Sequence, residues 1–260
     1  MTQTVHSPDG TYIAYDRSGD GPPLIIIGGA FNTRHTAAAL TPLLEPHFSV
    51  FQYDRRGRGD STEVGPWTVQ REIEDLGLLI EAAGGEAFVY GHSSGAVIGL
   101  EAAAAGLPIT KLAAYEPPYT RNANGSGAID GWGDSIQAAL DAGDDQGAAV
   151  RFLTGSGVDE ASVAGMQQLP WWPSMVVLAH TLPYDVALLG NGSVPVERFR
   201  DIRVPTLLLY GGDSPAWAGN ATAAAETAIP NASRMVVEGQ DHNTDAAVIA
   251  PLLVEYFSGD

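Results

Sequence analysis

The chain has 260 residues, 45% of them apolar, which is enough for one large domain or for a core with an insertion. Its 13 basic and 31 acidic residues give a formal net charge of −18, which disfavours nucleic acid, anionic membrane surfaces and polyanionic substrates as partners. There are no cysteines, so disulfides, thiolate metal sites and a cysteine nucleophile are excluded.

The first residues, Met1 to His6, lack the basic and apolar regions of a secretory leader, and no segment has the length of a membrane span. We therefore expect a cytoplasmic protein that acts on a small-molecule substrate, without a metal or other cofactor. The sequence leaves its oligomeric state open.

Strands and helices alternate in the first part of the chain. An Asp9-Gly10 turn before an alternating segment at 11–16 predicts a hairpin, and the apolar run at 24–27 predicts a strand buried on both faces. The further predicted elements are a helix at 35–44, a strand at 49–53, a helix at 69–83, a strand at 86–90, a helix at 94–105 and a strand at 112–115.

The alternation resumes near the end, with strands at 206–210 and 234–237 and helices at 217–228 and 245–257. This order predicts an α/β fold, in which helices flank both faces of a mostly parallel sheet. Ligands of such sheets bind beyond the carboxyl ends of the strands.

The interval between these two parts lacks strands. It predicts helices at 129–142, 145–153, 159–168 and 172–179, which we interpret as a helical cap inserted over the sheet edge. The expected organisation is therefore a core formed by 1–118 and 202–260, with a cap at 119–201.

The segment Gly91-His92-Ser93-Ser94-Gly95 contains G-x-S-x-G between a predicted strand and a predicted helix. A serine at such a turn is lifted clear of the backbone, and only small residues fit beside it because strand and helix approach closely there. Ser93 is the candidate nucleophile.

Four segments together resemble the α/β-hydrolase superfamily. They are Gly28-Gly29-Ala30-Phe31, the loop from Asp54 to Ser61, the turn around Ser93, and Gly239-Gln240-Asp241-His242. The resemblance implies an eight-strand-type, mostly parallel sheet with a helical cap, and an esterase-like enzyme with a serine nucleophile. It also implies that the arginine-rich loop at 54–60 has a structural role rather than a phosphate-binding one.

A serine hydroxyl needs an adjacent base to act as a nucleophile. His242 follows the last predicted strand and precedes the closing helix, as the chain order serine, acid, histidine of this fold requires. A histidine imidazole at this place can take the serine proton and pass it to the leaving group.

Two carboxylates compete for the role of the acid that orients His242. The family usually has G-x-x-D after the penultimate strand, whereas this chain has Gly211-Gly212-Asp213-Ser214, with the aspartate one residue early. Glu116, at the end of the strand after the turn helix, occupies a second position known in the superfamily. We prefer Asp213, because its loop has the usual position, and keep Glu116 as the rival.

Negative charge that develops on the substrate oxygen needs preorganised donors. The resemblance implies the backbone N–H of Ser94 as one donor and that of Ala30, or of its neighbour Phe31, as the other. The family often has His-Gly where this chain has Gly28-Gly29.

An aromatic and apolar set is expected to contact the substrate. Its members are Phe31, Trp172, Met175, Tyr184 and Trp217. His180, in the same region, is expected to be a hydrogen-bonded cap residue rather than a base.

The function that we expect is hydrolysis of a small, fairly apolar ester, lactone or thioester through an acyl-enzyme on Ser93. The alternative is a non-hydrolytic enzyme on the same framework, such as a perhydrolase or haloperoxidase-like protein, a C–C hydrolase or lyase, or a cyclase. A ligand receptor is the least favoured reading, because Ser93 and His242 are both present.

Overall fold

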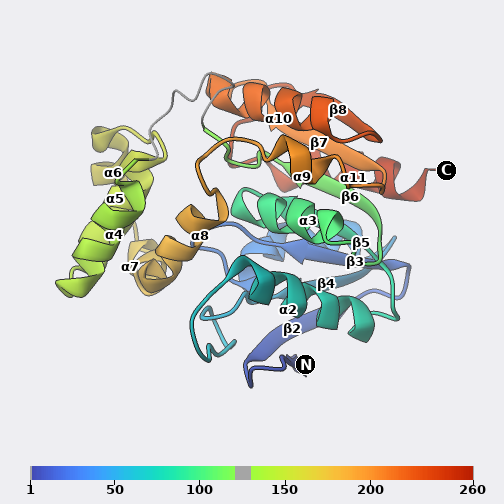
Figure 1. Cartoon of the computed structure of the whole chain (residues 1–260), viewed down its shortest axis with the longest axis horizontal. Helices are drawn as coiled ribbons and strands as arrows, with labels where there is room; N and C mark the ends of the chain where they lie inside the picture. Colours follow the sequence, from blue (N-terminus) through green and yellow to red (C-terminus); the bar gives the residue numbers. More distant parts are fainter. Residues whose placement is uncertain (1, 121–129, 260) are drawn as a thin grey trace.

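The centre of the molecule is an eight-stranded sheet with the order β1-β2-β4-β3-β5-β6-β7-β8 (Figure 1). The structure is a computed structural model that describes residues 2–120 and 130–259. Its strands are β1 (Gln3–His6), β2 (Tyr12–Ser18), β3 (Pro23–Ile27), β4 (Ser49–Tyr53), β5 (Ala87–His92), β6 (Ile109–Tyr115), β7 (Thr206–Gly211) and β8 (Ala232–Val237). β2 pairs antiparallel with β1 and β4, and all other neighbours are parallel.

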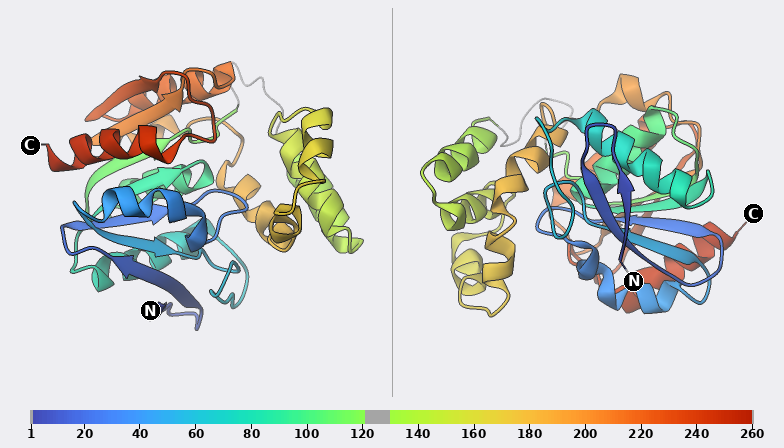
Figure 2. Two further views of the ribbon diagram at one scale, coloured as in Figure 1. Left: turned by 180° about the vertical axis from the view of Figure 1, so that it is seen from behind. Right: turned by 90° about the horizontal axis from the view of Figure 1, so that it is seen from below.

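Helices cover both faces of this sheet (Figure 2). One face carries α2 (Val69–Ala82), α3 (Ser94–Ala104) and α10 (Ala216–Ala228), and the other carries η1 (Arg34–Ala39), α1 (Thr41–Leu44) and α11 (Ala246–Ser258). Successive side chains of a strand point to opposite faces, so Val89 of β5 packs into the first layer and Tyr90 into the second.

The segment that we expected to form a cap lies beside the sheet and consists of short helices, which we call the cap below (Figure 1). They are α4 (Trp132–Asp141), α5 (Asp145–Gly155), α6 (Glu160–Met166), α7 (Trp172–Val176), η2 (Ala179–Thr181) and α8 (Leu182–Leu188). α8 contacts both α4 of the cap and α3 of the core. It therefore joins the cap to the helix that follows Ser93.

The last helix of the predicted cap interval, α9 (Val196–Phe199), packs against α3 and α10, and its Phe199 is part of the main core. The end of 119–201 thus covers the sheet rather than extending the cap. The start of the helix predicted at 129–142, Ile129, lies outside the described residues.

The strands and the helices of the core agree with the sequence prediction to within a few residues. The helix predicted at 35–44 is a 3-10 segment followed by one α-helical turn, and α8 and α9 were not predicted. Among the described residues, no helix is both long and apolar enough to cross a membrane.

Candidate active site

Ser93 occupies a strained turn between β5 and α3. Its backbone angles, φ 57° and ψ −126°, lie in a region that residues with a Cβ rarely adopt. A Cβ on Gly91 would collide with the backbone of Gly95, and one on Gly95 would collide with the backbone of Ile27. The two glycines of the motif are therefore required by the close approach of strand and helix.

Ser93, His242 and Glu116 form one chain of hydrogen bonds. Ser93 Oγ lies 3.1 Å from His242 Nε2, and His242 Nδ1 lies 2.6 Å from Glu116 Oε2. The three residues follow β5, β8 and β6, whose carboxyl ends meet at one edge of the sheet. Because a carboxylate can only accept here, the contact with Glu116 places the proton on Nδ1 and leaves Nε2 free to accept the serine proton.

Glu116, and not Asp213, is the carboxylate beside His242, so our preference for Asp213 was wrong. Asp213 is exposed, and within the described residues its carboxylate makes no hydrogen bond to the histidine. The loop after β7 instead supplies donors to Glu116: Gly211 N–H and Ser214 Oγ donate to Oε1 over 2.7 and 2.5 Å. Ser214 stands where the family pattern has its aspartate, and it binds the acid rather than replacing it.

Glu116 is fully buried, and burial by itself would raise the pKa of its carboxyl group. The hydrogen bonds from His242, Ser214 and Gly211 outweigh that effect and hold the pKa below its usual value. The carboxylate therefore stays ionised at neutral pH and can stabilise a positive charge on His242.

Backbone strain in the described chain gathers at this site. The three non-glycine residues with positive φ are Phe31 at 58°, Ser93 at 57° and Glu116 at 47°. Such conformations cost of the order of 1–3 kcal/mol each and persist only where the surrounding structure enforces them. All three residues belong to the set that we predicted from the sequence.

Two side chains outside that set hold the His242 loop. Tyr115 donates its hydroxyl to the carbonyl of Asp241 over 2.6 Å, and His92 Nε2 lies 2.7 Å from the carbonyl of His242. Burial, followed by the nearby His242, lowers the pKa of His92 to about 4. His92 is therefore neutral at neutral pH and carries its proton on Nε2, because a carbonyl only accepts.

The loop after β3 packs directly against Ser93, since a Cβ on Gly29 would lie 2.7 Å from the Cβ of Ser93. Asn32 Oδ1 accepts from Gly29 N–H over 2.9 Å, and Arg58 donates to the Gly29 carbonyl over 2.6 Å. The peptide group is planar, so fixing the Gly29 carbonyl also fixes the direction of the Ala30 N–H. In the described part of the chain the amides of Ala30, Phe31 and Ser94 have no hydrogen-bond partner.

Ser93 and His242 open into a cavity of about 660 Å³ between core and cap. Its apolar wall is formed by Phe31, Trp132, Phe152, Leu153, Val158, Met166, Trp171, Met175, Leu189 and Trp217. The carboxylates that line it are Asp185, Asp213 and Asp241, whereas no lysine or arginine does so among the described residues. The cavity thus has a largely apolar wall and, among the described residues, no cationic side chain that could bind an anionic group.

Three of the five expected pocket residues, Phe31, Met175 and Trp217, line this cavity. The predictions for Trp172 and Tyr184 were wrong. Trp172 is buried among Ala149, Leu153 and Val163 of the cap, and Tyr184 stacks on Trp67 at 5.2 Å between ring centroids. Trp171, the neighbour of Trp172 in the sequence, lines the cavity instead.

The arginines of the 54–60 loop are buried and paired with carboxylates. Arg56 binds Asp75 and Asp9, and Arg55 binds Glu72. This arrangement agrees with the structural role expected of the loop. His180 likewise contacts two carbonyl oxygens, those of Val177 and Gly57, at 3.0 and 2.9 Å.

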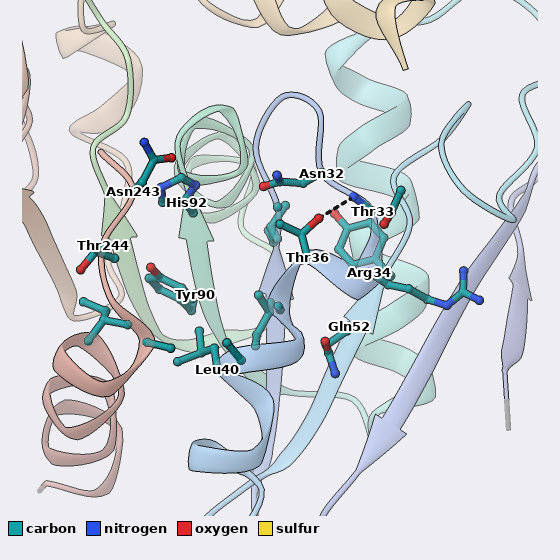
Figure 3. A pocket seen from close by; sticks show the side chains of 18 residues that line it. Asn32, Thr33, Arg34, Thr36, Leu40, Gln52, Tyr90, His92, Asn243 and Thr244 are labelled. Atoms are coloured by element: carbon teal, nitrogen blue, oxygen red, sulfur yellow. Dashed lines mark hydrogen bonds between the residues drawn. The ribbon is translucent and has the colours of Figure 1, made fainter. Parts of the chain in front are cut away.

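A second cavity, of about 290 Å³, lies beside the first, on the face of the sheet covered by η1 and α11. The two cavities share Asn32, Thr36, His92 and Asn243 in their walls. Figure 3 shows Asn32, His92 and Asn243 at one end of it and Gln52 at the other. His92 therefore belongs to the wall that the two cavities share.

Sequence reasoning missed His92, Tyr115, Ser214 and Asp185. His92 and Ser214 lay within motifs that it singled out, and Tyr115 directly precedes Glu116. Asp185 lies on α8, a helix that was not predicted from the sequence.

A family model described as "Alpha/beta hydrolase family" matches residues 18–252. The crystal structure of an alpha/beta hydrolase from Sphaerobacter thermophilus is 49% identical, with a TM-score of 0.93, and the match covers 98% of this chain and 100% of that one. An esterase from Exiguobacterium antarcticum shares the fold at 18% identity, with a TM-score of 0.79 over the whole of both chains.

Among curated proteins, the probable oxidoreductase EphD of Mycobacterium tuberculosis is 33% identical over 104 residues. That match covers 37% of this chain and 18% of the mycobacterial protein. The matched segment therefore spans less than a fifth of the length of that relative.

Proposed function

Because the chain belongs to the alpha/beta hydrolase family, we propose that it is a serine hydrolase that cleaves a small, apolar, uncharged ester, lactone or thioester. The observation that carries this proposal is the continuous contact from Ser93 through His242 to Glu116. A nucleophile, a base and an orienting acid in this order form the arrangement of acyl-transfer enzymes.

In this mechanism, Ser93 Oγ attacks the carbonyl carbon while His242 Nε2 takes its proton. The negative oxygen of the tetrahedral intermediate accepts from the N–H groups of Ser94 and Ala30, and the dipole of α3 favours the same charge. His242 then returns the proton to the leaving alcohol or thiol, which leaves an acyl-enzyme. Water then gives a proton to His242 Nε2 and attacks the acyl carbon. The bond between that carbon and Ser93 Oγ breaks, and His242 returns the proton to Oγ, which releases the acid.

Glu116 acts through His242. Its carboxylate keeps the proton of the neutral imidazole on Nδ1 and stabilises the imidazolium that forms when Nε2 accepts the serine proton. The fixed direction of the Ala30 N–H, set by the bond between Arg58 and the Gly29 carbonyl, supports Ala30 rather than Phe31 as the second oxyanion donor.

A fluorophosphonate probe tests for the reactive serine. Labelling of the wild type, with none in Ser93→Ala, is the expected result. If the wild type is not labelled, and the wild type and Ser93→Ala bind ligands equally well, the protein is instead a receptor.

Substrate preference is tested with p-nitrophenyl esters. Each added methylene that is buried in the cavity should raise kcat/KM about fourfold until the cavity is full, at about 0.8 kcal/mol per methylene. The p-nitrophenyl monoester of succinic acid should react at least about tenfold more slowly than the butyrate, because carboxylates line the cavity. Equal rates for these two esters would reject the preference for uncharged substrates.

A further inference from the structure

Asp185 lies on α8 of the cap, 2% exposed, and contacts three groups of the core. Its Oδ1 accepts from Ser94 Oγ over 2.6 Å and from Arg55 over 2.8 Å, and its Oδ2 accepts from Arg58 over 2.7 Å. One carboxylate of the cap thus binds a residue beside the nucleophile together with two arginines of the 54–60 loop.

Hydrogen bonds connect this carboxylate, indirectly, to both proposed oxyanion donors. On one side, Asp185 holds the side chain of Ser94, whose own N–H is the first donor. On the other side, Asp185 binds Arg58, and Arg58 donates to the Gly29 carbonyl, whose peptide group carries the N–H of Ala30. The two donors come from different strand ends, and the path through Asp185 links them.

The surrounding charges balance, since Arg55 also binds Glu72 at 2.7 Å and all four side chains are nearly fully buried. Burial alone would raise the pKa of Asp185, but Arg58 and Arg55 hold it below its usual value. The group is therefore ionised at neutral pH, when its hydrogen bonds are strongest.

We propose that Asp185 is a positioning residue of the cap. It fixes the positions of the oxyanion donors Ser94 N–H and Ala30 N–H relative to Ser93 Oγ. This inference rests on the proposed serine hydrolase function. It goes further by giving a cap helix a part in the rate of the chemical step, besides its part in forming the pocket.

The test is Asp185→Asn, assayed with p-nitrophenyl butyrate and with butylboronic acid, which forms a tetrahedral adduct with a reactive serine. We expect kcat to fall about 10- to 100-fold while KM stays within about threefold, because small displacements of oxyanion donors weaken transition-state binding specifically. The inhibition constant of the boronic acid should rise by a similar factor.

The matched control is Asp75→Asn. Asp75 is equally buried and accepts two hydrogen bonds from Arg56, but it touches neither Ser94 nor Gly29. It should lower the melting temperature by an amount similar to Asp185→Asn and leave kcat within about twofold. If kcat falls no further in Asp185→Asn than in Asp75→Asn, the inference is overturned.

Ser94→Ala is the test if Asp185→Asn does not fold. It removes the hydroxyl that donates to Asp185 and accepts from Arg55, and it keeps the backbone donor. We expect a loss in kcat of about three- to tenfold, and a value within twofold of the wild type would reject the inference. Failure of the proposed function has a different signature: the wild type itself would then react with neither ester nor fluorophosphonate, and both proposals would fall together.

Discussion

Ser214 donates its hydroxyl to Oε1 of Glu116 over 2.5 Å, while Oε2 of the same carboxylate binds His242. The loop after β7 therefore supports an acid that comes from the end of β6. Four consequences of this site and its surroundings can be measured.

Replacing the acid should separate the two candidate carboxylates. Glu116→Gln keeps the shape of the side chain but loses the charge that stabilises imidazolium, so kcat should fall roughly 10²- to 10⁴-fold. Asp213→Asn, the control, should stay within about threefold on p-nitrophenyl butyrate. A larger loss in Asp213→Asn than in Glu116→Gln would return the role to Asp213.

Because of Glu116, the folding stability of the protein should also depend on pH in the acidic range. Its pKa is below the ordinary 4.5 in the folded protein, so its contribution is fully present above that value and is lost as the pH falls through the lowered pKa. The melting temperature of the wild type should exceed that of Glu116→Gln at neutral pH, and the gap should narrow below about pH 4.5. A gap of constant size throughout would contradict the assignment.

Relieving the backbone strain at Ser93 should raise the free energy of unfolding. Ser93→Gly and Ser93→Ala both remove the proposed nucleophile, but only glycine adopts φ 57° and ψ −126° without strain. Glycine relieves the strain of the turn but also gives the unfolded chain more entropy, which lowers stability. We expect the net result in urea unfolding to be a free energy of unfolding about 1 kcal/mol higher for Ser93→Gly than for Ser93→Ala. Equal stability would mean that the turn costs nothing.

Two adjacent tryptophans of the cap should respond differently to truncation. Trp171 is 44% exposed and lines the cavity, so Trp171→Ala should raise KM for long-chain esters several-fold with little change in melting temperature. Trp172 is 4% exposed in the cap core, so Trp172→Ala should cost about 3–5 kcal/mol of stability. Reversed effects would show that the two side chains exchange places in solution.

The framework of the site could be predicted from the sequence because its signals are local. Buried parallel strands appear as continuous apolar runs, and small residues mark the turn that exposes Ser93. His242 was identified from its place after the last strand. Each of these inferences needs only a short segment of chain.

The acid and the cap contacts could not be predicted in this way. Glu116 has a positive φ, a conformation that the surrounding fold imposes on a residue that does not favour it, and its contact with His242 joins positions 126 residues apart. The start of α7 at Trp172 agrees with the prediction, but which of the two tryptophans enters the cap core depends on how α7 packs against α5 and α6. The helix of Asp185 begins at Leu182-Pro183, where proline in the first turn was its main local signal.

The position of Asp185 has a practical consequence for protein engineering. A chimera that receives the α4–α8 segment of another family member acquires a new pocket wall, but it also loses the anion that faces Arg55 and Arg58. Grafts intended to change substrate choice must therefore retain an aspartate at this point of α8, or supply another partner for the two guanidinium groups.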